Sequence, residues 1–223
     1  MAASEKPPYL PLFSEIREPL RSTLGEMLAD GRQEEEVRTL LPLLRVVGLD
    51  AGLSFQLCSW VSRGSLSMRA ELISLIEEIG DPAGGPALRL ALFDDHSETA
   101  ALSARVMGKI RFTAGLPVLL KAVKIRGERF PEIEAFLTAV CQSLGDLEDE
   151  RAVPFLEDLA RKRALLWTKT QATPVRLAAI EALSRINRPE VWAFLETLAG
   201  ERNEAIQGIL EKITQEKTQS MAP

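Results

Sequence analysis

The chain has 223 residues, of which 46% are hydrophobic and 26% charged, with a formal net charge of −5. This composition is ordinary for a folded chain with a sizeable core, and a mildly acidic chain lacks the basic footprint of a duplex-binding protein. We see no basic segment followed by an apolar run at the start and no apolar stretch near the roughly 20 residues that span a bilayer. We therefore expect a cytoplasmic protein without a membrane partner.

Apolar residues recur with the period of an α-helix along most of the chain, and no stretch alternates as a strand would. Two helices are predicted first, at 13–30 and 34–47. Helical hairpins follow at 51–63 with 66–79, 83–94 with 97–109, 114–126 with 131–144, 151–167 with 174–186, and 190–199 with 203–216. The ends, 1–8 and 218–223, are expected to be disordered.

The turns between these hairpins belong to an internal repeat. Each repeat closes an apolar helix, turns through Gly, Asp or Pro, and begins a new helix near a proline, which the first turn of a helix tolerates well. Its anchor positions are Arg45, Glu77, Gly108, Gly145 and Ser184, which gives intervals of 32, 31, 37 and 39 residues. Periods of this length with two helices per unit are typical of solenoids. The predicted fold is all-α, a right-handed α-α superhelix of about five to six hairpins in a single domain at 9–217.

Segments 79–88, 151–156 and 174–183 resemble HEAT-like repeats of the short bacterial kind, as in phycobilisome lyase-type repeat proteins. The resemblance covers about 45–217 and implies a HEAT-like solenoid in a bacterial protein. It implies no single function, because this architecture hosts many roles. The chain departs from the repeat pattern at Ala100 and Leu137, which stand where Arg69 and Arg176 carry the arginine of the second helix.

Few residues carry the chemistry of an enzyme. His96 is the single histidine and follows Asp94 and Asp95 in a predicted turn, where capping by the carboxylates is favoured over a metal ligand or a general base. Cys58 and Cys141 lie in apolar stretches and are expected to be reduced, buried thiols. One histidine cannot build a His-rich metal site. It also excludes the iron-binding HEAT-like hydroxylases, which the resemblance would require to carry several His-Glu pairs. We predict no catalytic residue, no metal and no cofactor.

The predicted function is a non-catalytic protein–protein interaction scaffold or adaptor. Two alternatives remain, a HEAT-like DNA-acting protein similar to the alkylpurine glycosylases and a protein similar to the chromophore lyases. The glycosylases look basic and rich in concave aromatic residues, whereas this chain is acidic. Its Trp60 and Trp192 align with apolar positions of other repeats, which favours packing.

Two surfaces are candidates for binding a protein partner, and neither nucleic acid nor a small molecule is expected. The first is the concave face, where the position three before each of the last four anchors is polar and two arginines lie nearby: Arg69, Ser74, Arg105, Gln142, Arg176 and Glu181. These arginines could instead pair with acidic neighbours between repeats. The second is a basic edge, for an acidic partner, at the turns inside the two longest repeats: Lys124, Arg126, Arg129, Arg161, Lys162, Arg163, Trp167 and Lys169. A solvated basic turn is the alternative there.

Overall fold

The computed structural model describes residues 10–29, 32–129, 133–161 and 173–220. Within these ranges the chain forms twelve α-helices and three short 3₁₀ helices, without a strand. The all-α prediction is therefore confirmed. None of the described helices combines the length and the apolar character needed to span a bilayer.

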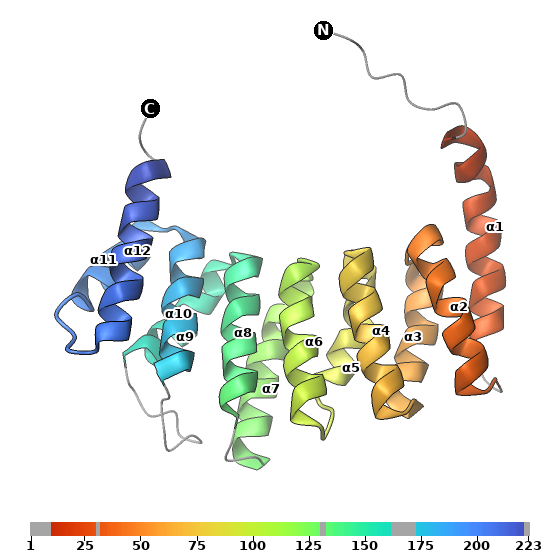
Figure 1. Ribbon diagram of the computed structural model, residues 1–223, viewed down its shortest axis with the longest axis horizontal. Coiled ribbons are helices and arrows are strands. Elements are labelled where there is room, and N and C mark those ends of the chain that lie inside the picture. Colours follow the sequence, from red (N-terminus) through yellow and green to blue (C-terminus); the bar gives the residue numbers. More distant parts are fainter. Residues whose placement is uncertain (1–9, 30–31, 130–132, 162–172, 221–223) are drawn as a thin grey trace, which may run out of the picture. The chain divides into compact units, whose positions relative to one another are not determined.

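The chain divides into two compact units, Met1–Leu90 and Ala91–Pro223. In the first unit α1 packs against α2 and α3, and α4 packs against α2 and α3 (Figure 1). Its elements are α1 (Leu10–Leu28), α2 (Glu34–Val47), α3 (Ala51–Arg63), α4 (Leu66–Ile79), η1 (Pro82–Gly84) and α5 (Gly85–Ala91), which ends at the border of the unit. The prediction of a single domain at 9–217 stays a prediction.

In the second unit the helices α6, α8 and α10 pack side by side in one layer, with α7 and α9 behind them (Figure 1). The final helices α11 and α12 both pack against α10. The elements are α6 (Ser97–Lys109), η2 (Thr113–Gly115), α7 (Leu116–Arg129), α8 (Glu134–Leu147), η3 (Glu150–Ala152), α9 (Val153–Ala160), α10 (Thr173–Ile186), α11 (Pro189–Thr197) and α12 (Glu204–Ser220).

Side chains that accept hydrogen bonds from free backbone N–H groups begin several of these elements. Asp50 accepts from the backbone N–H of Leu53 at the start of α3, and Ser65 accepts from that of Met68 at the start of α4. Asp81 and Asp149 do the same for η1 and η3. The first N–H groups of a helix have no partner inside the helix, so these caps fix where each one starts.

Left-handed backbone recurs with the intervals that the sequence predicts. Gly80, Arg111, Glu148 and Asn187 have φ values of 69°, 51°, 54° and 48°, and each follows the end of a second helix. They are separated by 31 (80 to 111), 37 (111 to 148) and 39 (148 to 187) residues. A left-handed residue satisfies the last carbonyls of a helix and stops it. The sequence repeat is therefore a repeat of backbone conformation.

The longer intervals have a definite location. After the anchors Glu77, Gly108 and Gly145 the first helix begins eight residues later, at Gly85, Leu116 and Val153. The turn between repeats is thus constant in length for these three, and the additional residues fall in the first helix or in its connection to the second.

Glycines let the second helices pack closely. A β-carbon on Gly145 of α8 would lie 2.8 Å from the Cα of Ala182 on α10, and Gly108 of α6 meets α8 in the same way. Contacts of this kind leave no room for a side chain at the anchor. They place α6, α8 and α10 against one another along their C-terminal halves.

Several helix bounds differ from the prediction. The last helix runs to Ser220, so 218–220 are helical, and α7 runs to Arg129 instead of 126. In contrast, α5 ends at Ala91, because the Asp94 N–H bonds the Ala91 carbonyl in a turn and the helix does not continue to 94. Helix α9 ends at Ala160, and most of the predicted extension to 167 lies outside the described residues, as does the segment 1–8.

Candidate functional site

A groove crosses the layer of second helices in the second unit, with a volume of about 550 Å³. Three of the residues predicted for the concave face line it: Arg105 from α6, Gln142 from α8 and Glu181 from α10. We call these three residues the polar row. The rest of the lining is Gly108, Lys109, Arg111, Gly145, Asp146, Glu148 and Arg185.

The polar row is accessible and its side chains are available. Arg105 is exposed, whereas Gln142 and Glu181 are half-buried. Among the described residues, none forms a side-chain hydrogen bond or ion pair with the Arg105 guanidinium, the Gln142 amide or the Glu181 carboxylate. The row therefore presents a cation, a neutral amide and an anion, in that order, on the second helices of three consecutive repeats.

Ion pairs hold the charged residues beside the row. Arg185 of α10 pairs with Asp146 of α8. Arg111, just after α6, pairs with Glu148, just after α8, at 3.1 Å. Exposed pairs of this kind contribute only about 0–1 kcal/mol to stability. Their main effect here is to join consecutive repeats and to occupy charges that would otherwise compete for a ligand.

The first unit holds the remaining residues of the predicted concave face. Ser74 is exposed and lines a smaller pocket of about 250 Å³ between α2 and α4, next to an ion pair of Arg45 with Glu78 at 2.5 Å. Arg69 is half-buried on α4. These two residues do not line the groove of the second unit.

Arg176 was predicted to bind a partner on the concave face, but its side chain is buried and bonded inside the protein. Only 1% of it is exposed, its Nε donates to the Ala160 carbonyl at 2.9 Å, and its guanidinium pairs with the Glu201 carboxylate at 2.6 Å. The physical reason is that it follows Val175 on the apolar face of α10 and its long side chain reaches the end of α9. For Arg176 the structure therefore matches the alternative given above, in which the arginine pairs with an acidic neighbour, here Glu201.

Arg126 was predicted to lie on the basic edge, but it too is buried and bonded inside the protein. It is 2% exposed, donates to the Asp94 carbonyl at 2.5 Å and to the Ser97 hydroxyl at 3.3 Å, and places its guanidinium carbon 5.1 Å from the centre of the Phe136 ring. Because α7 continues past 126, this residue is helical, one turn beyond the buried Ala122 and on the same face.

The rest of the basic edge is described only in part. Lys124 is exposed. The guanidinium of Arg161 lies 4.4 Å from the centre of the Phe194 ring and 3.1 Å from the Glu157 carboxylate. The predicted residues Lys162, Arg163, Trp167 and Lys169, and the side chain of Arg129, lie outside the described part of the structure.

His96 and the two cysteines lie on different elements: His96 directly before α6, Cys58 on α3 and Cys141 on α8. The backbone N–H of His96 donates to the Asp94 carboxylate at 2.9 Å, and the His96 Nδ1 lies 3.4 Å from the same oxygen. Burial raises the pKa of the Cys58 thiol and raises that of Cys141 to about 12, so both are poor nucleophiles. Across the described ranges no group of three or more His, Cys, Asp or Glu is arranged to hold a metal ion.

The tryptophans that are described have internal partners. The Trp60 indole is 4% exposed and donates to the Leu28 carbonyl at 2.9 Å. The Trp192 indole donates to the Asn187 side chain at 2.9 Å, and the Lys217 ammonium lies 3.8 Å from the centre of its ring. Both serve packing in the structure.

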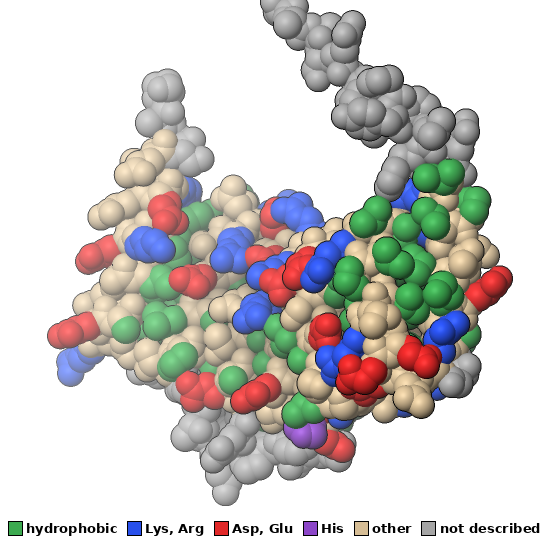
Figure 2. All heavy atoms as spheres, turned by 45° about the vertical axis from the view of Figure 1, so that its right-hand side comes forward, with side chains coloured by type: hydrophobic (Ala, Val, Ile, Leu, Met, Phe, Trp, Pro, Cys, Tyr) green, Lys and Arg blue, Asp and Glu red, His purple; other side chains and the backbone are tan. Residues whose placement is uncertain are grey.

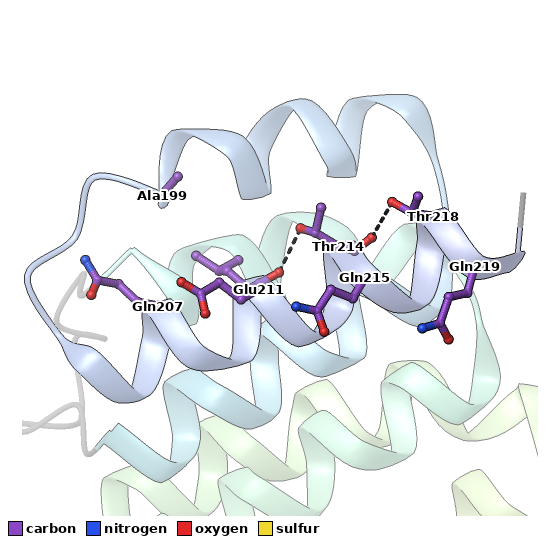
Figure 3. Close-up of a pocket in the computed structure, with 8 residues that line it drawn as sticks. Ala199, Gln207, Glu211, Thr214, Gln215, Thr218 and Gln219 are labelled. Carbon is purple, nitrogen blue, oxygen red and sulfur yellow. Dashed lines mark hydrogen bonds between the residues drawn. The ribbon is translucent and has the colours of Figure 1, made fainter.

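Sequence reasoning missed a second groove, of about 690 Å³, along the outer face of α12 (Figure 3). It runs from Ala199 past Gln207 and Glu211 to Gln219. Two of its hydroxyls are already used, because Thr214 donates to the Leu210 carbonyl at 2.7 Å and Thr218 to the Thr214 carbonyl at 2.9 Å. Glu211 is the single ionisable residue among those lining it, so this groove offers few features that would select a ligand.

Exposed apolar side chains gather on the first unit (Figure 2). On α1 and α2 they include Ile16, Leu20, Leu43 and Val46, the last of which is 54% exposed. The groove of the second unit is different in character, since most of its lining residues are charged.

No family model matches the chain, and no curated protein matches it either. Among solved structures, the chain is similar to human deoxyhypusine hydroxylase in complex with glycerol, with 18% identity and a TM-score of 0.41. The similarity covers 92% of this chain and 98% of that one.

This comparison corrects the predicted function. The sequence indicated a non-catalytic scaffold or adaptor, but the similar structure is that of an enzyme. The prediction of a non-catalytic scaffold is therefore withdrawn. At 18% identity we transfer neither the activity nor the ligand of that protein to this chain.

Proposed function

We propose that the groove across α6, α8 and α10 binds an extended segment of another protein. The observation that carries this proposal is the polar row of Arg105, Gln142 and Glu181, whose side chains are available for a ligand on the adjacent helices α6, α8 and α10. The role concerns recognition at one groove, and it is equally compatible with an enzyme that acts on the bound segment.

The dimensions of the groove suit an extended peptide. Packed helices lie about 8–10 Å apart, so a ligand that reaches from α6 across α8 to α10 spans about 16–20 Å. An extended chain rises about 3.3 Å per residue, which makes that span equivalent to about five or six residues. A small molecule that contacted only one helix pair would leave one end of the row unused.

The chemistry at the middle of the groove also favours a peptide. The Gln142 amide has both a donor and an acceptor, which match the carbonyl and the N–H of a peptide group. An extended segment exposes such groups at regular intervals. Gln142 is half-buried, so a hydrogen bond at this position is partly shielded from water.

We further propose that the hairpins form a HEAT-like array with the right-handed α-α superhelical arrangement. The recurrence of left-handed turns at Gly80, Arg111, Glu148 and Asn187 supports this proposal, because a regular turn stacks successive hairpins in the same way. A cytoplasmic location stays a prediction.

Peptide-display selection with a random twelve-residue library tests the binding role. The full-length protein is used as bait, and enriched peptides are measured by fluorescence anisotropy against the wild type and three variants: Gln142→Ala, Arg105→Ala and the control Lys121→Ala. Lys121 is exposed on α7, does not line the groove and is not a residue of the predicted basic edge. We expect the two groove variants to lose most of the affinity and the control to keep it. Peptides that bind all four proteins equally would refute the proposal, as would a selection that yields no binder.

A further inference from the structure

This inference rests on the proposed function: we infer that the groove selects its peptide ligand by the charges of two side chains. It selects a segment with an acidic side chain at the α6 end and a basic side chain at the α10 end, separated by about five or six residues of extended chain. The two charges of the ligand meet Arg105 and Glu181, and the neutral backbone between them meets Gln142.

The α6 end is suited to an acidic side chain. Arg105 and Lys109 are one helical turn apart on the same face of α6, and Arg111 follows at the end of the helix. Arg111 is occupied by its pair with Glu148, whereas the Arg105 guanidinium has no described partner. A guanidinium binds a carboxylate through two parallel hydrogen bonds, which makes Arg105 the specific contact.

The α10 end is suited to a basic side chain. Glu181 is half-buried, and its carboxylate has no described partner. Arg185 lies one turn further along α10, but it is paired with Asp146 and so does not neutralise Glu181. Partial burial lowers the effective dielectric around a charge, so a lysine or arginine of the ligand is attracted more strongly there than at an open surface.

The same arrangement disfavours other segments. A wholly acidic segment would bring a carboxylate against Glu181, and a wholly basic one would bring a cation against Arg105. Like charges placed together cost free energy, and specificity arises from this repulsion as well as from the matching contacts. Adjacent acidic and basic residues cannot satisfy the row either, because its two ends lie about 16–20 Å apart.

The ion pairs beside the row strengthen this selection. The Arg185–Asp146 and Arg111–Glu148 pairs each use one residue of either sign, so they add little net charge to the groove. The charged side chains of the row itself are therefore Arg105 and Glu181, and neither has a described partner.

The experiment uses the strongest twelve-residue binder from the display selection, labelled with a fluorescent dye, and the full-length protein. Within that peptide each acidic residue is changed to Gln and each basic residue to Gln in turn. We expect one acidic and one basic position, five or six residues apart, to weaken binding about tenfold each, as charge-assisted hydrogen bonds would. A second peptide, in which the basic residue is moved next to the acidic one, should bind as weakly as the peptide without it.

Double-mutant cycles then assign each charge to its partner. In the Arg105→Gln protein, replacing the acidic residue of the peptide by Gln should no longer weaken binding, while replacing the basic residue should still weaken it. In Glu181→Gln the reverse is expected. The controls Lys121→Gln and Glu196→Gln change exposed residues of the same sign as Arg105 and Glu181 that do not line the groove, and both effects should persist in them.

The outcomes separate the two proposals. If binding depends on Gln142 but is indifferent to the charges of the peptide, or if each charge couples equally to both ends, the charge-reading inference is wrong and the peptide groove stands. If Gln142→Ala, Arg105→Gln and Glu181→Gln all leave binding unchanged, the groove itself is not the binding site and both proposals fall.

Discussion

Gly108 on α6 lies so close to Ser143 on α8 that a β-carbon on Gly108 would stand 2.5 Å from the Ser143 Cα. The obstacle is backbone, which cannot rotate away, so any side chain at this anchor must push the two helices apart. Because these helices carry Arg105 and Gln142, the contact also sets the width of the groove.

We expect Gly108→Ala to lower the free energy of unfolding by about 1–3 kcal/mol, the usual cost of overpacking. The matched control is Gly208→Ala on α12, where an added β-carbon has no atom within 4 Å. Alanine favours a helix over glycine by about 1 kcal/mol, so the control should be as stable as the wild type or more so. Urea unfolding followed by circular dichroism measures both, and equal gains in the two variants would show that α6 and α8 are not tightly packed.

Arg126 is expected to act on stability and not on a surface interaction. Arg126→Ala removes a buried cation that holds the Asp94 carbonyl and covers Phe136, and we expect a loss of about 2–4 kcal/mol. Lys124→Ala, two residues earlier at an exposed site, should change stability by less than about 0.5 kcal/mol. Thermal denaturation distinguishes the two variants. An Arg126→Ala protein as stable as the wild type would contradict a buried, stabilising role for this residue.

Glu34 should make the first unit sensitive to acid. Hydrogen bonds from the Ser65 hydroxyl, the Ser65 backbone N–H and Arg38 stabilise its carboxylate and lower its pKa from 4.5 to about 2. A depressed pKa contributes stability that is fully present above about pH 4.5 and is lost as the pH falls through about 2.

We therefore expect Glu34→Gln to be less stable than the wild type at neutral pH, with a difference that shrinks below pH 4.5 and disappears near pH 2. Urea midpoints at several pH values measure this. The control is Glu26→Gln, since Glu26 is exposed on α1 and takes no part in the hydrogen bonds around Glu34. A constant difference between Glu34→Gln and wild type across the range would argue against the network.

The two cysteines should differ in reactivity. Cys141 is fully buried on α8 with a pKa of about 12, whereas Cys58 is half-buried on α3 and its pKa is raised to a lesser degree. The thiolate is the reactive form, so a maleimide should label Cys58 slowly and Cys141 only after unfolding. Peptide mapping by mass spectrometry reports each site, with Cys58→Ser as the control that should stay unlabelled in the native state. Equal labelling of both sites would mean that α8 opens readily.

The helical repeat could be predicted from the sequence because it rests on local physics. Apolar periodicity, prolines in the first turns and the small anchors Gly108, Gly145 and Ser184 all act within a few residues of one another. Position within the repeat also predicted which residues share a face. That is why Arg105, Gln142 and Glu181, three residues before their anchors, were placed together, and the structure brings them into one groove.

The roles of individual arginines could not be predicted in this way. A sequence pattern treats arginine as a surface residue, whereas its long aliphatic stem lets the charge lie beside a buried carbonyl. Arg126 and Arg176 lie on the buried faces of α7 and α10 and donate to carbonyls far away in sequence, at Asp94 and Ala160. Which carbonyl lies within reach depends on how helices pack, and no local pattern encodes that. The α12 groove was missed for the same reason, since its hollow arises from the placement of Ala199 opposite the helix.

The constant eight-residue spacing from anchor to first helix at Gly108 and Gly145 has an evolutionary consequence. Insertions and deletions in these two repeats can accumulate at the opposite end of the hairpin, between the first helix and the second, without shifting the phase of the residues on α6 and α8. The length of these connections and the groove residues on α6 and α8 can then evolve independently. Homologues would be expected to differ most in length within 124–134 and 160–173, while keeping the spacing from Gly108 to Leu116 and from Gly145 to Val153 unchanged.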